Sequence, residues 1–198
     1  MNSGINAQTF KTISRLVLVT LAFQITLFGA AMAYEEPKYE LIKSTAIYEI
    51  RKYGDRLAVQ TIQNSGEDRA FGRLFSYISG ANLNSNKIAM TTPVIQSSNG
   101  NGMVMNFFLP SKYSEKTAPI PESKNVSLVT IRGGYYAVIK YSGRSTESNF
   151  NKHVAILKDA LDKDGIKAFK HAIKATYNGP LTPFFLRRNE AMYKVKWE

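Results

Sequence analysis

The chain has 198 residues, a formal net charge of +11, two histidines and no cysteine. The missing cysteines exclude a disulfide framework, a thiolate nucleophile and a zinc site built from cysteine and histidine. The fold must therefore rest on the burial of apolar side chains, which make up 44% of the sequence.

The first 33 residues differ from the rest of the chain. Lys11 and Arg15 precede a mostly apolar run of about 13 residues, which ends at the small-residue triplet Ala31-Met32-Ala33. A membrane anchor is the alternative, but it needs roughly 20 apolar residues. The pattern predicts a secretory signal peptide over residues 1–33, export to the periplasm or the exterior, and no stable membrane insertion after cleavage.

The remaining 165 residues, 34–198, suit one domain. Cleavage would remove two positive charges and no negative ones, which lowers the net charge from +11 to +9. A basic exported domain could meet anionic lipid, polyanions or an acidic ligand. The basic residues are dispersed, however, with no run of five like charges, which favours a generally basic surface, and no nucleic-acid partner is expected.

The first half of this domain alternates between strand and helix patterns. Residues 39–53 predict two short strands or one bent strand, and Arg56–Ile62 alternates like another strand. A helix is expected from about Glu67 to Ser79, capped by Ser65 or Asn64.

Residues 87–96 follow as an apolar, β-prone run interrupted by Pro93, which has no N–H for a ladder and so predicts a strand with an irregularity. Residues 99–102 predict a hairpin turn, 103–109 a strand, and the proline-containing stretch 110–124 an extended loop.

The second half repeats the order of strand, loop and helix. Strands are expected over 126–132 and 135–141, a helix over Glu147–Lys163, and strands over 172–177 and 191–197. At an offset of 79 residues, Ala58 falls on Ala137 and Phe71 on Phe150 without a gap, which favours a duplicated unit. These elements predict an α+β fold with mostly antiparallel strands and two helices.

Catalytic motifs are sparse. The chain has no G-x-S-x-G elbow, no Walker loop and no G-x-G-x-x-G, so an enzyme is not predicted, and a hydrolase is the least implausible exception. His153 lies at the shoulder of the second helix's apolar stripe. It is more often a packed histidine than an axial heme ligand, and it remains a weak candidate for the second role.

Two apolar segments are candidates for a ligand surface. On the first predicted helix, the apolar stripe of Phe71, Leu74, Phe75 and Ile78 fits either a core face or the edge of a groove. Residues 177–190, which include Phe184, fit either a structured loop or the lip of that groove. Both alternatives stay open from the residues alone.

Several motifs, in order along the chain, resemble those of the SOUL family of heme-binding proteins. They are Tyr48-Glu49-Ile50-Arg51, Phe71-x-x-Leu74-x-x-Tyr77-Ile78-x-Gly80, Lys87-Ile88-Ala89-Met90-Thr91-Thr92-Pro93-Val94, Phe108-Leu109-Pro110, Pro119-x-Pro121, Tyr177-Asn178 and Arg188-Asn189-Glu190.

The resemblance implies a distorted antiparallel β-barrel with two helices and an internal pseudo-twofold repeat. It also implies a shallow apolar groove that holds heme or a related tetrapyrrole. The expected ring contacts are Phe71, Leu74, Phe75, Ile78, Leu181, Phe184 and Phe185, with Lys52 or Arg56 toward the ring's carboxylates.

Some members of the family place a histidine directly after Y-E-I-R, and Lys52 stands there in this chain. The chain therefore resembles the histidine-free branch, and a protonated lysine is a poor iron ligand. The predicted function is an exported, non-catalytic tetrapyrrole-binding protein. The alternative is a binding module for another amphipathic molecule or an envelope protein.

Overall fold

The computed structural model describes residues 34–63, 69–98, 100 and 102–197. The predicted signal peptide and the predicted helix caps Asn64 and Ser65 lie outside these residues. Residues Glu35–Glu198 form one compact unit. In the described part of the chain, no helix is both long and apolar enough to cross a membrane.

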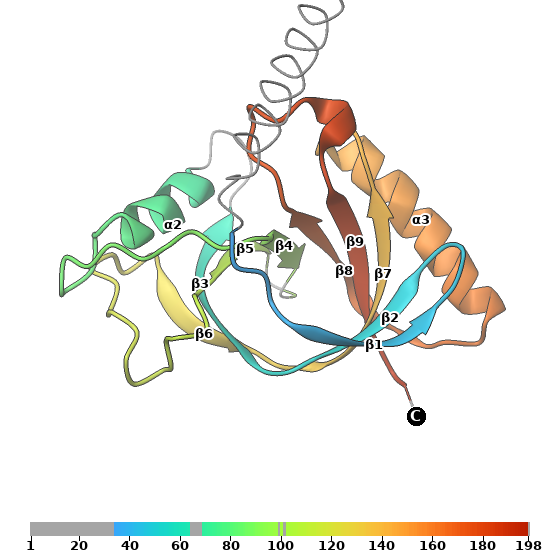
Figure 1. Cartoon of the computed structure of the whole chain (residues 1–198), viewed down its shortest axis with the longest axis horizontal. Helices are drawn as coiled ribbons and strands as arrows, with labels where there is room; N and C mark the ends of the chain where they lie inside the picture. Colours follow the sequence, from blue (N-terminus) through green and yellow to red (C-terminus); the bar gives the residue numbers. More distant parts are fainter. Residues whose placement is uncertain (1–33, 64–68, 99, 101, 198) are drawn as a thin grey trace, which may run out of the picture. The chain divides into compact units, whose positions relative to one another are not determined.

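In the described residues, nine antiparallel strands form one curved sheet (Figure 1). The strands are β1 (Tyr39–Ser44), β2 (Glu49–Tyr53), β3 (Arg56–Gln63), β4 (Val94–Ser98), β5 (Met103–Phe108), β6 (Ser127–Ile131), β7 (Gly134–Tyr141), β8 (Ala168–Thr176) and β9 (Asn189–Val195). Their order across the sheet is β1-β2-β7-β9-β8-β4-β5-β3-β6. The sheet therefore has edges at β1 and β6 and is not closed, so the α+β part of the prediction is confirmed and the barrel is not.

Two α-helices pack on one face of this sheet. Helix α2 (Ala70–Ile78) covers β3 and β5, and α3 (Glu147–Lys163) covers β7, β8 and β9. We call this side the helix face and the opposite side the inner face. Each helix buries its apolar side chains in a separate core cluster, one centred on Leu74 and one on Leu157.

The observed bounds of α3 agree with the prediction, whereas the observed start of α2 does not. Helix α3 has the predicted bounds, because Thr146 accepts a hydrogen bond from the Asn149 backbone N–H and Gly165, with φ of +68°, ends it. Helix α2 begins three residues later than expected, at Ala70, and its N-cap residue Arg69 makes no side-chain cap bond.

The strand predicted over residues 87–96 is shorter than expected, since pairing begins only at Val94. Pro93 follows a cis peptide bond and has no N–H to donate, and the N–H of Thr92 bonds outside the sheet to the Glu35 carbonyl. The other predicted strands are present within a few residues of their expected ends.

The internal repeat appears in the sheet order. Reading outward from the central β4–β8 pair gives β4-β5-β3-β6 on one side and β8-β9-β7-β2 on the other. The predicted gapless offset of 79 is wrong, however, because it pairs Ala58 on the inner face with Ala137 on the helix face. In the helices the burial patterns match at an offset of 83, which places Leu74 on Leu157 and Ile78 on Leu161.

Candidate ligand-binding sites

Helix α2 carries a pair of half-exposed aromatic rings, which we call the α2 plate. Phe71 is 48% exposed and Phe75 is 50% exposed, and their ring planes differ by 13° with centroids 6.1 Å apart. Phe71 also contacts the ring of Phe107 edge-on, at 5.1 Å. The α2 plate is therefore a half-exposed apolar surface made of two stacked, nearly parallel rings, of which Phe71 rests on the core ring of Phe107.

The other two predicted contacts on α2 lie underneath. Leu74 is fully buried and Ile78 is 5% exposed, and both belong to the core cluster of this helix. They support the α2 plate and do not offer a surface to a ligand. The sequence pattern identified the apolar stripe correctly but did not separate its exposed edge from its buried centre.

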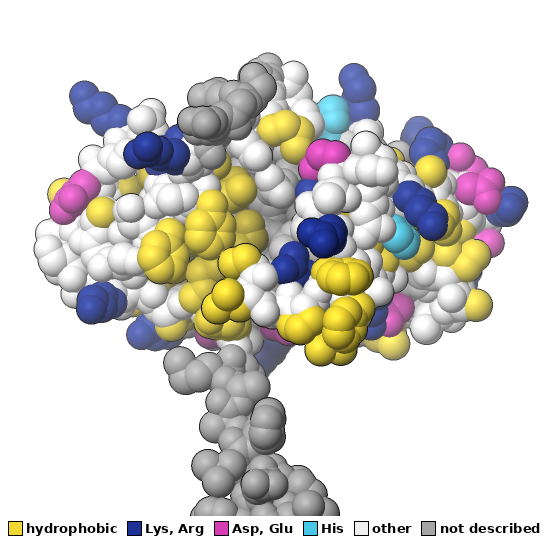
Figure 2. All heavy atoms as spheres, turned by 90° about the horizontal axis from the view of Figure 1, so that it is seen from above, with side chains coloured by type: hydrophobic (Ala, Val, Ile, Leu, Met, Phe, Trp, Pro, Cys, Tyr) yellow, Lys and Arg dark blue, Asp and Glu magenta, His cyan; other side chains and the backbone are white. Residues whose placement is uncertain are grey.

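The late loop presents the second set of predicted apolar contacts, and it is well anchored. Leu181, Phe184 and Phe185 are all exposed, and Phe184 and Phe185 belong to the 3₁₀ helix η1 (Phe184–Leu186). Arg187 donates hydrogen bonds to the carbonyls of Thr182 and Pro180, which holds the loop in a fixed path. Figure 2 shows that hydrophobic side chains gather in two areas of one face, over α2 and around η1.

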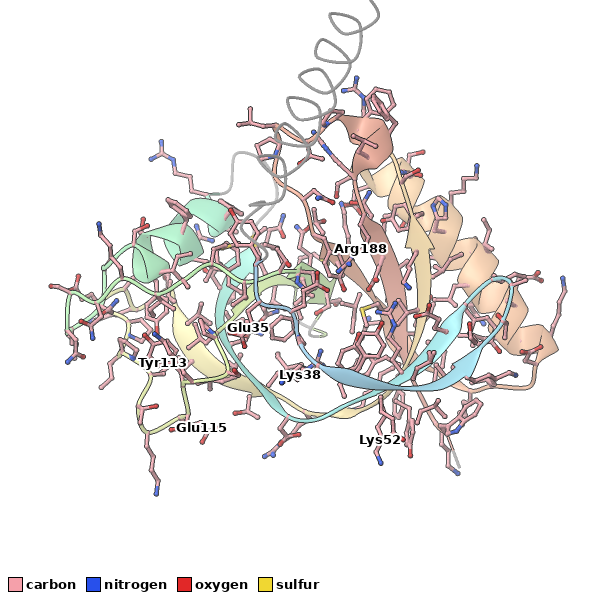
Figure 3. All side chains as sticks on the ribbon, viewed as in Figure 1. Glu35, Lys38, Lys52, Tyr113, Glu115 and Arg188 are labelled. Carbon is pink, nitrogen blue, oxygen red and sulfur yellow. The ribbon has the colours of Figure 1, made fainter. Side chains whose placement is uncertain are left out.

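The two predicted cations contact other aromatic rings than those of the α2 plate and the η1 loop. Lys52 is an exposed β2 side chain whose ammonium lies 5.7 Å from the centroid of the Tyr135 ring (Figure 3). Arg56 lies on the inner face, against the ring of Phe108. Because Phe107 and Phe108 are neighbours in β5, they point to opposite faces, so Arg56 and the α2 plate are separated by the sheet.

A cation that sequence reasoning missed lies beside η1 instead. The guanidinium of Arg144 is exposed and lies 5.3 Å from the centroid of the Phe184 ring. The loop between β7 and α3 brings it there, and the Gly143 N–H donates to the Phe184 carbonyl. No sequence signal linked Arg144 to a residue 40 positions away.

His153 is a packed side chain of α3, not part of the α2 surface. Its ring stacks on Tyr141 with centroids 4.1 Å apart, and its Nδ1 lies 2.7 Å from the Asn149 carbonyl oxygen. The described residues contain no group of three or more metal-binding side chains.

The inner face holds an aromatic pocket that the sequence did not predict. Tyr53, Tyr136 and Phe108 surround Arg56, and we call this space the inner pocket. Its volume is about 30 Å³, enough for a water molecule or two but far too small for a tetrapyrrole. The rest of its wall comes from Glu36, Pro37, Tyr39, Pro93, Ile95, Ile131, Ile173, Tyr177 and Met192.

A buried ion pair lies next to the inner pocket. Arg51 donates from both terminal nitrogens to the two carboxylate oxygens of Glu190, at 3.0 and 3.2 Å, and each side chain is 1% exposed. Burial acts to lower the pKa of Arg51, but the carboxylate of Glu190 outweighs it and raises that pKa. Tyr177 donates to the same carboxylate, and burial together with Glu190 raises its pKa.

Residues 35–38, which we call the strap, cross the inner face before β1 (Figure 1). The Ser111 N–H donates to the Glu35 carboxylate at 2.8 Å, and Arg188 pairs with Glu36 at 2.5 Å. The strap forms one wall of the inner pocket and one wall of a larger neighbour.

This larger neighbour, the side pocket, has a volume of about 410 Å³. It shares Glu36, Pro37, Arg56 and Phe108 with the inner pocket. Figure 3 labels Glu35 and Lys38 on the strap and Tyr113 on the loop after β5, all three of which line it. The remaining lining residues are Gly54, Asp55, Leu57, Thr91, Leu109, Pro110 and Ser111.

Comparison with known families decides the relationship of the chain. The family model described as SOUL heme-binding protein matches residues 34–194. The chain belongs to the SOUL heme-binding protein family. No curated protein is detectably similar to it.

Solved structures of low sequence identity share the SOUL-family fold. The C-terminal domain of EcmrR is 9% identical with a TM-score of 0.57, covering 81% of this chain and 99% of that one. An uncharacterized conserved protein from Listeria innocua is 11% identical with a TM-score of 0.55, covering 83% and 94%. A protein from Listeria innocua described as a hydrolase is 12% identical with a TM-score of 0.53, covering 86% and 96%. At these identities the likeness concerns the fold alone.

Proposed function

We propose that this SOUL-family protein is a non-catalytic binding protein for heme or a related tetrapyrrole, and that the ring lies on the α2 plate. The observation that carries the proposal is the half-exposed pair of Phe71 and Phe75, whose rings are stacked and nearly parallel. Aromatic rings bind flat conjugated ligands by offset stacking and apolar burial. Family membership supports the class of ligand.

The chemistry of the surrounding residues fits the ring and its carboxylates. Phe184, Phe185 and Leu181 would cover a further part of the ring from the η1 loop. Arg144, beside Phe184, is the arginine that would pair with a carboxylate, since a guanidinium binds carboxylates through two parallel hydrogen bonds. This assignment replaces Lys52 and Arg56, which lie elsewhere.

Titration with hemin tests the proposal. A saturable change of the Soret band near one equivalent is expected for the wild-type chain, and at least tenfold weaker binding for Phe75→Asp, which puts a charge on the stacking surface. Phe169→Asp is the matched control, because Phe169 is a phenylalanine of similar exposure, 55%, on β8.

Linear, non-saturating absorbance changes that are equal in the wild type and in Phe75→Asp would refute a specific site on α2. Equal losses in Phe75→Asp and Phe169→Asp would do the same. If native protein purified from its source carries another amphipathic molecule in place of a tetrapyrrole, mass spectrometry of the extract would favour the alternative binding function.

We also propose that the protein acts after export, on the strength of the signal-peptide pattern in residues 1–33. Amino-terminal sequencing of the natively secreted protein should begin at Tyr34. A native protein that begins at Met1 would overturn this part of the proposal.

A further inference from the structure

Arg56 occupies an unusual position for an arginine. Its guanidinium carbon lies 4.4 Å from the centroid of the Tyr53 ring, 4.9 Å from that of Phe108 and 5.4 Å from that of Tyr136. Three aromatic rings therefore hold the cation in place without neutralising it.

Within the described part of the chain, the charge of Arg56 has no acidic partner. Among the described residues no carboxylate forms an ion pair with it, and its buried Nε finds no hydrogen-bond acceptor. Burial lowers the pKa of the Arg56 guanidinium, and the nearby tyrosines only partly oppose this effect. A shielded cation without a counter-ion costs free energy, so a chain that keeps one at a pocket wall gains when an anion binds there.

The acids around the side pocket are already engaged. Glu35 accepts from the Ser111 N–H, and Glu36 pairs with Arg188. Asp55 accepts from the Gly133 N–H and pairs with Arg132.

The cations of the side pocket are not engaged in the same way. Neither Arg56 nor the exposed Lys38 forms an ion pair with any acid of the described chain. Glu35 accepts from the backbone N–H of Ser111 and pairs with no cation of the described chain, so two unpaired cations of the pocket stand against one unpaired acid, and the balance is positive.

Five apolar residues contribute to the rest of the wall, and the pocket has the size of a small-molecule site. Pro37, Leu57, Phe108, Leu109 and Pro110 line it. Its volume of about 410 Å³ lies within the range of about 300–1,000 Å³ that is typical for such sites. This combination selects an apolar body with a single anionic group.

We propose that the side pocket binds a small aromatic carboxylate, with the carboxylate on Arg56 and the ring between the strap and the loop after β5. This site is distinct from the tetrapyrrole surface, because Arg56 and the α2 plate lie on opposite faces of β5. A lipophilic cation is disfavoured, since it would lie against an unneutralised guanidinium.

Calorimetric titration of the full mature chain with 2-naphthoate tests the site, and 2-naphthamide serves as the neutral isostere. Saturable binding of 2-naphthoate is expected, with the amide at least tenfold weaker, because it lacks the charge that Arg56 compensates. Equal affinity for the two compounds, or no binding of 2-naphthoate, would overturn the proposal without any variant.

Two variants then separate this site from the one on α2. Arg56→Gln should weaken 2-naphthoate at least tenfold and leave the hemin titration unchanged, whereas Arg144→Gln should leave 2-naphthoate unchanged. Arg56→Gln with full 2-naphthoate affinity would refute the role of Arg56. A wild-type chain that binds 2-naphthoate but shows no saturable hemin binding would refute the α2 proposal alone, so the two failures are distinguishable.

Discussion

The buried pair of Arg51 and Glu190 is the most constrained polar contact of the inner face. Replacing Glu190 with Gln removes the carboxylate and leaves the Arg51 charge with less compensation inside the protein. The free energy of unfolding should fall by about 3–5 kcal/mol, as measured by urea denaturation.

Asp162→Asn is the matched control for this measurement, because Asp162 pairs with Lys158 on the surface of α3. An exposed i,i+4 pair contributes only about 0.3–0.5 kcal/mol. Similar losses for the two variants would contradict the special role of the buried pair.

His153 gives a second prediction at the residue scale. Its ring is engaged by Tyr141 and by the Asn149 carbonyl, away from the α2 plate. We expect His153→Ala to leave the Soret maximum and the hemin affinity unchanged. A shifted Soret band in this variant would identify His153 as an iron ligand and would require the tetrapyrrole to lie on α3.

Sequence periodicity predicts which residues share a face of one helix or strand, but it does not predict contacts between residues far apart in the chain. The stripe on α2 was readable because apolar side chains recur every three to four residues. The pairing of Arg51 with Glu190 joins strands 139 positions apart, and the ring contacts of Arg56 come from three separate strands. Tyr53 of β2, Tyr136 of β7 and Tyr177, which directly follows β8, meet only through the curvature of the sheet, so no local pattern could identify the pocket.

Within α2, the neighbouring residues Leu74 and Phe75 differ in burial, so their removal should affect stability differently. Leu74→Ala should cost about 2–5 kcal/mol of unfolding free energy, because it removes a fully buried side chain from the core under the helix. Phe75→Ala should cost less than about 1 kcal/mol, since half of that ring is already in water.

Thermal and urea unfolding of both variants, followed by circular dichroism, measure this contrast. The reverse order of the two losses would mean that the exposed edge of α2, and not its buried centre, holds the helix on the sheet.

Elements were predictable where local chemistry determines them. Helix α3 has its predicted bounds because Thr146 and Gly165 supply a cap and a stop. The prediction of strand structure before Pro93 was wrong, because the Thr92 N–H bonds to the carbonyl of Glu35 in the strap. Residues 87–96 alone carry no sign of that distant partner. The gapless repeat also failed, because strands and helices of the two halves match at different offsets.

At the scale of the whole molecule, buried tyrosines determine how the fold responds to alkali. Burial raises the pKa of Tyr77 to about 12, and burial followed by the charge of Glu147 raises that of Tyr141 to about 12. Burial also raises the pKa of Tyr53 and of Tyr136.

Above pH 10 the unfolded chain therefore releases protons that the folded chain retains, so stability is complete below pH 10 and is lost as the pH rises toward 12. Each retained proton corresponds to a loss of about 1.4 kcal/mol per pH unit.

Urea denaturation between pH 8 and pH 11.5, with tyrosinate absorbance at each pH, checks this expectation. Stability that stays constant up to pH 11.5 would contradict it.

The architecture was predictable as an antiparallel α+β fold, whereas its open edges at β1 and β6 depend on strand pairing over long separations.

The alternation of β5 has a consequence for how this protein can change. Phe107 supports the helix-face surface and Phe108 lines the pockets of the inner face, one residue apart. Substitutions can alter one surface while the other keeps its side chains, so the two proposed sites can change independently over evolution. An insertion or deletion of one residue within β5 would instead exchange the two walls and damage both sites at once.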